Sequence, residues 1–265
     1  IRVLSFPLDW RSDKRIIGLG GACGCVGDSV LGPRQLTGVQ GMDYLVFDYL
    51  AEMTLSSFAH ARKADPAAGF AADFVQVTLR EILPECRRRG IRLIANAGGL
   101  NPRGCAEAIE ALARELHCPV RVAWVEGDDC LGMLPELATL GVRDFYTGAP
   151  MPEGITNANA YVGAQPIACA LAMGAQVVVT GRIVDGAAPL GGLGHAFAWS
   201  AGESYSNVWC GSGSSRGPWP FPSFFFAAGR SIVPSPSAGG GGSEGSTAFG
   251  VTSSFFARLG AFAAR

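Results

Sequence analysis

The sequence is poor in charge and in lysine, and it has no hydrophobic run long enough to cross a membrane. Charged residues make up 16% of its 265 residues, against roughly a quarter in an average globular protein. No apolar run approaches the ~18 residues of a membrane span. These absences exclude a disordered polar chain, a coiled coil and a membrane span, so the 48% of hydrophobic residues must form a buried core.

The charge is close to neutral, with a net charge of −1 and a pI near 6.4. A broad nucleic-acid-binding face needs a clear excess of basic residues, so we expect no nucleic-acid partner. The only lysines are Lys14 and Lys63, and neither stands in a glycine-rich loop. This excludes a phosphate-binding loop of the Gly-x-x-x-x-Gly-Lys type.

Close pairs of cysteines are almost absent. Of eight cysteines, only Cys23 and Cys25 stand near each other, and no second pair completes a zinc site. A chain of this length needs no disulfide framework. We therefore expect reduced thiols, no metal site, and an intracellular protein located in the cytoplasm.

Two parts of the chain differ in composition. Over residues 1–200, short apolar runs alternate with stretches of helical length, which predicts a three-layer, Rossmann-like α/β domain with a mostly parallel sheet and helices on both faces. In residues 201–265, Gly, Ser and Pro make up 30 of the 65 residues. That composition predicts a poorly ordered tail or a changed reading frame near Ser200. We expect strands at 15–19, 44–47, 91–95, 120–125 and 176–180, and helices at 71–88, 103–117 and 161–171, the first helix kinked or cut short at Pro84.

Polar residues gather just after the expected strands. The carboxyl ends of parallel strands meet at one edge of a sheet, where open α/β sheets bind ligands, so we expect a ligand site there. The candidate acid–base or metal-binding carboxylates are Asp48, Glu52, Asp128 and Asp129, and His195 is a further catalytic candidate. The candidate ligand-binding residues are Gly20, Gly24, Asn96, Gly98, Gly99, Asn101, Asn159, Thr180, Arg182 and Asp185.

These residue types suit an anionic ligand. Arg182 can pair with a carboxylate or phosphate, and glycine-rich turns at helix starts can hold a phosphate through backbone N–H groups. We expect a small anionic substrate or a coenzyme A thioester, and a divalent cation stays open as a cofactor. A purely structural interpretation also stays open, because Asp48 and Asp128-Asp129 suit helix N-caps and Asn101-Pro102 has the pattern of a cap followed by proline.

A glycine-rich segment, Gly18-x-Gly20-x-x-x-Gly24, is expected to form a turn after the first strand, and Asp48 follows the next strand. This pattern is the dinucleotide fingerprint with one extra residue. Glycine-rich turns are common at this place in α/β folds, so the signal is weak. It nevertheless leaves an NAD(P)-dependent oxidoreductase open as an alternative function.

Seven ordered segments together resemble the acyclic terpene utilisation AtuA family. They cover 18–28, 48–52, 96–101 with Pro102, 125–129, 159–164, 178–182 with Asp185, and 195–199. The resemblance implies a role in the catabolism of acyclic terpenes such as citronellol and geraniol, by way of branched acyl-CoA thioesters, and gives no reaction. This sequence departs from the family pattern at 144–156, which looks like an insertion, and after Trp199, where the pattern stops.

The leading hypothesis is therefore an enzyme acting on or beside branched acyl-CoA thioesters. Some relatives of the family look joined to, or encoded beside, acyl-CoA carboxylase subunits. A non-catalytic accessory subunit of such a carboxylase is the second hypothesis, and the NAD(P)-dependent oxidoreductase is the third. The sequence leaves the reaction, the substrate and the oligomeric state open.

Overall fold

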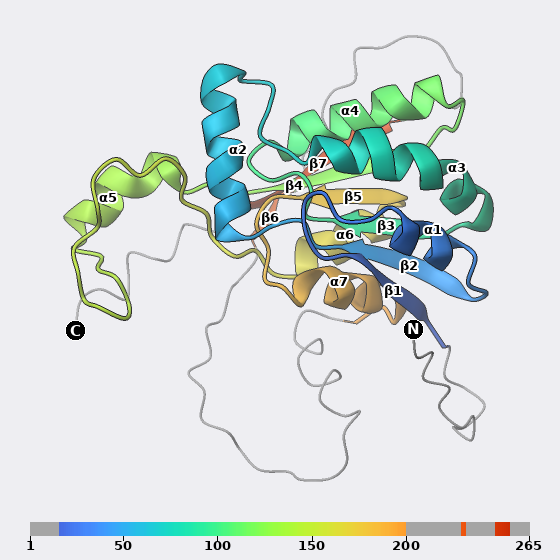
Figure 1. Cartoon of the computed structure of the whole chain (residues 1–265). Helices are drawn as coiled ribbons and strands as arrows, with labels where there is room; N and C mark the ends of the chain where they lie inside the picture. The colour runs from blue at the N-terminus through green and yellow to red at the C-terminus, as the bar shows by residue number, and fades with distance from the viewer. Residues whose placement is uncertain (1–15, 200–228, 232–246, 255–265) are drawn as a thin grey trace.

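A computed structural model describes residues 16–199, 229–231 and 247–254 and shows a three-layer α/β domain (Figure 1). One sheet lies between two layers of helices, which confirms the predicted fold class. The strands are β1 (Gly18–Cys23), β2 (Met42–Phe47), β3 (Arg92–Ala95), β4 (Arg121–Glu126), β5 (Val177–Thr180), β6 (Gly229–Ser231) and β7 (Thr247–Ser254). The helices are α1 (Leu31–Thr37), α2 (Glu52–Ala64), η1 (Phe74–Leu79), α3 (Arg80–Arg89), α4 (Pro102–Glu115), η2 (Leu131–Met133), α5 (Leu134–Thr139), α6 (Gln165–Ala172) and α7 (Ala187–Ala196).

The sheet has the strand order β1-β2-β3-β5-β4-β7-β6. Every neighbouring pair is parallel except β6 and β7, which are antiparallel. The carboxyl ends of β2, β3, β5 and β4 are therefore consecutive along one edge of the sheet. This edge is where the sequence predicts the site.

Alternate residues of the central strands face opposite layers. In β2, Leu45 and Phe47 pack into one core cluster with η1, α3 and α4, whereas Tyr44 and Val46 pack into a second cluster with α6 and α7. Both sides of the sheet are thus buried, as parallel sheets require. Burying a side chain such as Phe47 stabilises the folded state by about 1.5–3 kcal/mol. The two clusters therefore fix the positions of the strands, and the strands fix the residues that follow them at the edge of the sheet.

Three local predictions were wrong. The first strand begins at Gly18 and runs through the segment expected to be a glycine-rich turn, and β1 is an edge strand of the sheet. The helix containing Pro84 is not cut short there, because α3 continues to Arg89 and is preceded by the π-helical turn η1, whereas the alternative of a kink at Pro84 stays a prediction. The stripe that began at Tyr161 yields a helix only from Gln165 onward.

The C-terminal part of the chain contributes β6, of three residues, and β7, of eight residues, and the sequence analysis assigned no structure to either segment. The other residues of 201–265 lie outside the described residues, as does the prediction of a poorly ordered tail there. Residues 131–155, including α5 and most of the predicted insertion, form an arm that extends away from the sheet (Figure 1). No helix in the described ranges is long and apolar enough to cross a membrane.

Candidate functional site

Most of the predicted site residues do gather at the carboxyl edge of the sheet. The loops after β2, β3, β4 and β5 carry them there, and contacts between loops join residues distant in sequence. Gly20 and His195 are the candidates that lie elsewhere, and Gly24 follows the carboxyl end of the edge strand β1, away from the central loops. The candidates at this edge are Asp48, Glu52, Asn96, Gly98, Gly99, Asn101, Asp128, Asp129, Asn159, Thr180, Arg182 and Asp185.

Asp128 organises the part of the edge next to β4 and β5. Its carboxylate Oδ2 accepts hydrogen bonds from the Arg182 backbone N–H, at 2.7 Å, and from Asn159 Nδ2, at 2.9 Å. The residue is only 4% exposed, and this burial raises the pKa of its carboxyl. Asp128 thus fixes the backbone of one loop and the side chain of another, and its own carboxylate is not among the groups that line the pocket below.

Arg182 lies beneath the surface and has most of its donors occupied. Its guanidinium donates from Nη1 to the Leu50 carbonyl at 3.3 Å, and Nη2 lies 3.3 Å from Asp185 Oδ1 and 3.8 Å from Glu52 Oε1. The Tyr161 ring covers one face of the guanidinium, with its centroid 4.2 Å from Cζ, a cation–π contact. The side chain is 6% exposed, whereas those of Glu52 and Asp185 are 79% and 76% exposed.

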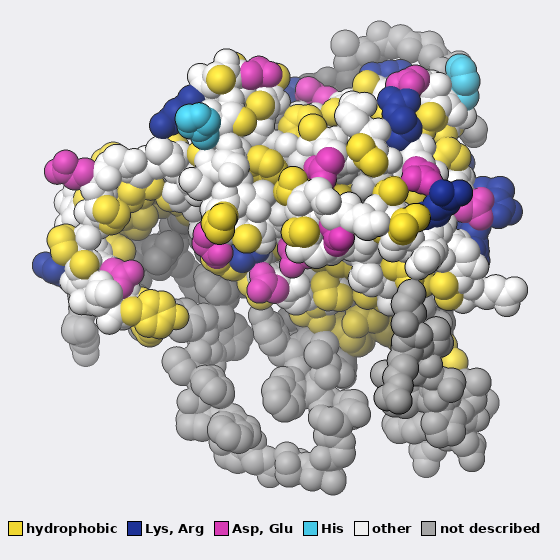
Figure 2. All heavy atoms as spheres, viewed as in Figure 1, with side chains coloured by type: hydrophobic (Ala, Val, Ile, Leu, Met, Phe, Trp, Pro, Cys, Tyr) yellow, Lys and Arg dark blue, Asp and Glu magenta, His cyan; other side chains and the backbone are white. Residues whose placement is uncertain are grey.

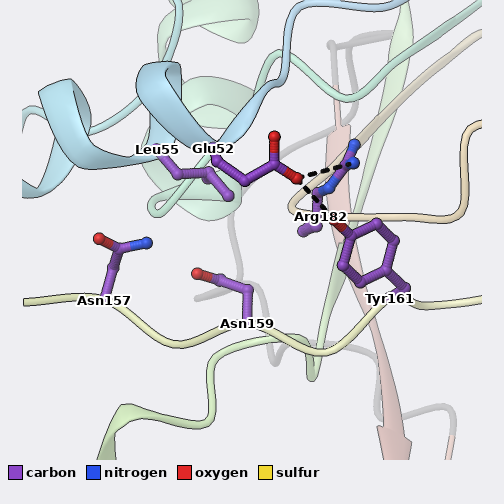
Figure 3. Close-up of a pocket in the computed structure, with 6 residues that line it drawn as sticks. All are labelled: Glu52, Leu55, Asn157, Asn159, Tyr161 and Arg182. Atoms are coloured by element: carbon purple, nitrogen blue, oxygen red, sulfur yellow. Dashed lines mark hydrogen bonds and ion pairs between the residues drawn. The ribbon is translucent and has the colours of Figure 1, made fainter. Parts of the chain in front are cut away.

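A small pocket opens beside this arginine (Figure 3). Its volume is about 130 Å³, enough for a head group and not for a whole coenzyme. At its rim the Tyr161 hydroxyl donates to Glu52 Oε1 at 2.8 Å. We call this space the Arg182 pocket, and its lining residues are Glu52, Leu55, Asn157, Asn159, Tyr161 and Arg182.

Two polar atoms of the Arg182 pocket residues have no hydrogen-bond partner among the described residues. They are the donor Arg182 Nε and the acceptor Asn159 Oδ1, and both are buried. Buried polar atoms in folded proteins are nearly always paired, because an unmade bond costs about 1–3 kcal/mol. A donor and an acceptor left open beside one pocket are what a polar ligand group would satisfy.

Sequence reasoning missed three residues of this pocket, the apolar Leu55 and the polar Tyr161 and Asn157. Tyr161 was assigned to the apolar stripe of a helix, although a tyrosine at the start of such a stripe also presents a hydroxyl. Asn157 precedes the predicted segment by two residues, and no pattern in the sequence marked it. Tyr161 and Asn157 both belong to the extended stretch that the Asp129–Asn159 bridge joins to the loop after β4.

A second polar group lies between the ends of β2 and β3. Asn96 Nδ2 donates to Asp48 Oδ1 at 2.6 Å, and its Oδ1 accepts from the Tyr49 backbone N–H, also at 2.6 Å. Asn96 is 2% exposed and Thr180 is fully buried, and the Thr180 hydroxyl donates to the Gly181 carbonyl. These contacts hold the strand ends together, and a ligand could reach only Asp48 of this group.

Other candidates have structural roles. Asn101 caps α4, as its pattern suggested, by accepting from the Gly104 N–H at 3.0 Å, and its Nδ2 donates to the carbonyls of Ala67 and Ala68. At Gly98 and Gly99, an added Cβ would meet the Thr180 carbonyl oxygen at 2.7 Å and the Phe58 ring at 2.5 Å. These two glycines therefore permit close packing.

The glycine-rich segment does not form a phosphate-binding turn. Gly20 lies inside β1. After β1, the Gly24 N–H donates to Asp28 at 3.0 Å and the Gly27 N–H donates to Asp73 at 2.8 Å. Carboxylates thus occupy the donors that a cofactor phosphate would need, and this removes the support for a dinucleotide fingerprint.

His195 lies at the other end of the sheet. It closes α7, where Tyr44 Oη is 2.7 Å from its Nδ1 and Arg92 Nη1 is 2.7 Å from its Nε2. Tyr44 and Arg92 stand near the amino ends of β2 and β3. His195 is therefore separated by the length of the strands from the Arg182 pocket, and its contacts are those of a structural histidine.

The charge of the edge differs from the anion-binding site that we predicted. Arg182 contacts the carboxylates of both Glu52 and Asp185, and Asp128 lies directly behind it. The pKa of Glu52 is held below its usual range by hydrogen bonds from its own backbone N–H and from Tyr161, so Glu52 is ionised at neutral pH. Within the described ranges, no group of three or more His, Cys, Asp or Glu residues is placed to hold a metal ion.

Comparison with known proteins places the chain in a family. No curated protein and no solved structure matches the chain. The family model described as "Acyclic terpene utilisation family protein AtuA" matches residues 17–208 and so spans most of the chain, including every residue of the Arg182 pocket. The chain therefore belongs to the acyclic terpene utilisation family AtuA.

Proposed function

We propose that the protein acts in the breakdown of acyclic terpenes on a branched acyl compound whose head group enters the Arg182 pocket. The family description supports a role in acyclic terpene utilisation. The observation that carries the rest is the buried, unpaired Arg182 Nε, which lies at the ligand-binding edge of an open parallel sheet. A carbonyl oxygen of the ligand would accept from this donor.

The size of the pocket decides which part of the ligand it holds. At about 130 Å³ the pocket holds an acyl head group and the first carbons of its chain. A coenzyme A moiety, if present, would remain outside, over the exposed side chains at the rim. The same edge of the sheet would thus serve a thioester without a dedicated phosphate site.

The pocket residues have separable roles in this proposal. Arg182 binds the head group through its open donor Nε, and Asn159 lines the pocket beside it. Glu52, which is ionised and lines the pocket, is the acid–base candidate. Asp128 is a positioning residue, because it holds Arg182 and Asn159 without lining the pocket.

Isothermal titration calorimetry with citronellyl-CoA, and with free coenzyme A as the comparison ligand, tests this function. We expect the thioester to bind more tightly than free coenzyme A, and the Arg182→Met variant to lose that difference because Met removes the open donor Nε. Arg103→Met is the matched control, because Arg103 is an exposed arginine that pairs only with Glu107 within its own helix. Equal binding of the thioester and free coenzyme A would contradict the proposal.

The accessory-subunit hypothesis is a second candidate, because one observation favours it. Phe145 and Tyr146, on the arm that extends from the sheet, are each 91% exposed, which is unusual for large aromatic side chains. A Phe145→Ser/Tyr146→Ser variant should lose co-purification with an acyl-CoA carboxylase if the arm docks there, whereas citronellyl-CoA binding should not change. No contact in the described residues favours the oxidoreductase.

A further inference from the structure

We infer that the Arg182 pocket takes an uncharged acyl head group, an ester or thioester, and excludes the free carboxylic acid, with Glu52 and Asp185 as the specificity-determining residues. The inference rests on the proposed function, since it concerns the same pocket. It narrows the ligand class and reverses the anionic preference expected from the sequence.

The donors that Arg182 still offers are the first reason. A carboxylate is bound best by two parallel N–H groups of one guanidinium. Here Nη1 donates to the Leu50 carbonyl and Nη2 faces two carboxylates, so among the described residues Nε is the one guanidinium nitrogen with neither a hydrogen bond nor an ion pair. A single N–H suits a single carbonyl oxygen.

The second reason is the charge around the guanidinium. Its positive charge is already balanced by Glu52 at 3.8 Å and Asp185 at 3.3 Å. Figure 2 shows acidic side chains gathered on the face near the lower end of α2, with only a little basic surface among them. A carboxylate entering here would add another negative charge at close range, and each such repulsion weakens binding by about three- to tenfold at a hydrated site.

The third reason is the open acceptor of Asn159. Its Nδ2 is committed to Asp128, so Oδ1 is the atom that remains unpaired. An amide oxygen has no hydrogen to donate, and it repels the charged oxygen of a carboxylate more strongly than the oxygen of a neutral carbonyl. Asn159 Oδ1 therefore disfavours an anion more than it disfavours a neutral ester or thioester.

Three matched ligands test the inference: methyl citronellate, citronellate and citronellol, titrated by calorimetry near neutral pH. For the wild-type protein we expect the ester to bind about tenfold more tightly than the acid. A higher salt concentration should reduce this gap in affinity, because the rim carboxylates are exposed and are screened by ions. In the Glu52→Gln/Asp185→Asn variant we expect the gap to shrink to about threefold, mainly because the acid binds better. Glu107→Gln, which removes an equally exposed carboxylate from the remote Arg103 pair, should leave the gap unchanged.

The outcomes separate this inference from the proposed function. If the acid binds the wild type as tightly as the ester, the inference is overturned while the proposed function stands. The double variant could keep the full difference in affinity between ester and acid, with no effect of salt on that difference in the wild type. Desolvation of the acid would then explain the preference for the ester, and the role of Glu52 and Asp185 would be overturned. If neither ester nor acid binds, both the inference and the proposed function fall.

Discussion

Replacing Gly181 by alanine tests whether Asp128 holds the site together. An added Cβ at Gly181 would meet the Asp128 carboxylate, with Cγ only 2.6 Å away. The backbone of Gly181 is not left-handed, so alanine itself meets no conformational barrier there. The carboxylate cannot move into solvent without breaking its bonds to the Arg182 N–H and Asn159 Nδ2, because Asp128 is 4% exposed.

The expected cost follows from these contacts. Overpacking a close-packed site costs about 1–3 kcal/mol, and each of the two lost hydrogen bonds about 1 kcal/mol. We therefore expect Gly181→Ala to lower the free energy of unfolding by about 3–5 kcal/mol, a large part of the 5–15 kcal/mol typical of a domain. Urea unfolding followed by circular dichroism measures this as a lower midpoint with an unchanged slope.

A double-mutant cycle isolates the clash. In an Asp128→Ala background the obstructing carboxylate is gone, so Gly181→Ala should then cost less than about 1 kcal/mol. Gly163→Ala is the matched control, because an added Cβ there meets nothing within 4 Å and the backbone is not left-handed. An equal cost of Gly181→Ala in both backgrounds would refute the reasoning, since the cost would then not come from Asp128.

Three further predictions concern a helix cap, the protonation of Asp128 and a histidine distant from the pocket. Asn101→Ala should lower the melting temperature, because losing an N-cap costs about 1 kcal/mol and the bonds to Ala67 and Ala68 are lost as well. Burial raises the folded-state pKa of Asp128 above the unfolded value of about 3.9, so the folded state holds the extra proton and the free energy of unfolding should fall as the pH rises from about 4 towards the folded pKa. Asp128→Asn should remove that slope in urea titrations, and an unchanged slope would assign it to another group. His195→Gln should leave the affinity for methyl citronellate within about twofold in calorimetry, because substitutions distant from a site rarely couple to it.

The layers and the edge of the sheet could be predicted because they depend on local patterns. Alternating apolar residues such as Leu45 and Phe47 mark a buried strand, and polar residues directly after such strands must lie at one edge when the strands are parallel. The cap formed by Asn101 was also visible, since Asn-Pro at a helix start has a local physical cause. The exception was β1, where the glycines of an edge strand looked the same as those of a turn.

The roles of the edge residues could not be predicted, because they depend on contacts between distant segments. Asp128 and Asp129 are neighbours in sequence, yet one is buried behind Arg182 and the other is exposed and caps the turn at Leu131. At Gly98 and Gly181 the close packing of neighbouring atoms leaves no space for a side chain. In the sequence, such glycines cannot be distinguished from glycines that contact a ligand. The sequence placed Tyr161 in the apolar stripe of a predicted helix, but in the structure the first residues of that stripe are extended.

The charge of the pocket shows why residue type alone misleads about ligand class. An arginine after a buried parallel strand is a reasonable sign of an anion site, and Arg182 stands at such a place. Its net effect is set by Glu52, 130 positions earlier in the sequence, and by Asp185, three residues later, because both reach the same Nη2. In the proposed function, the open Nε would act towards a ligand as a single donor on a guanidinium whose charge is already balanced. Such a donor would suit a neutral carbonyl group, because at an unbalanced guanidinium a neutral carbonyl would be outcompeted by any cellular anion.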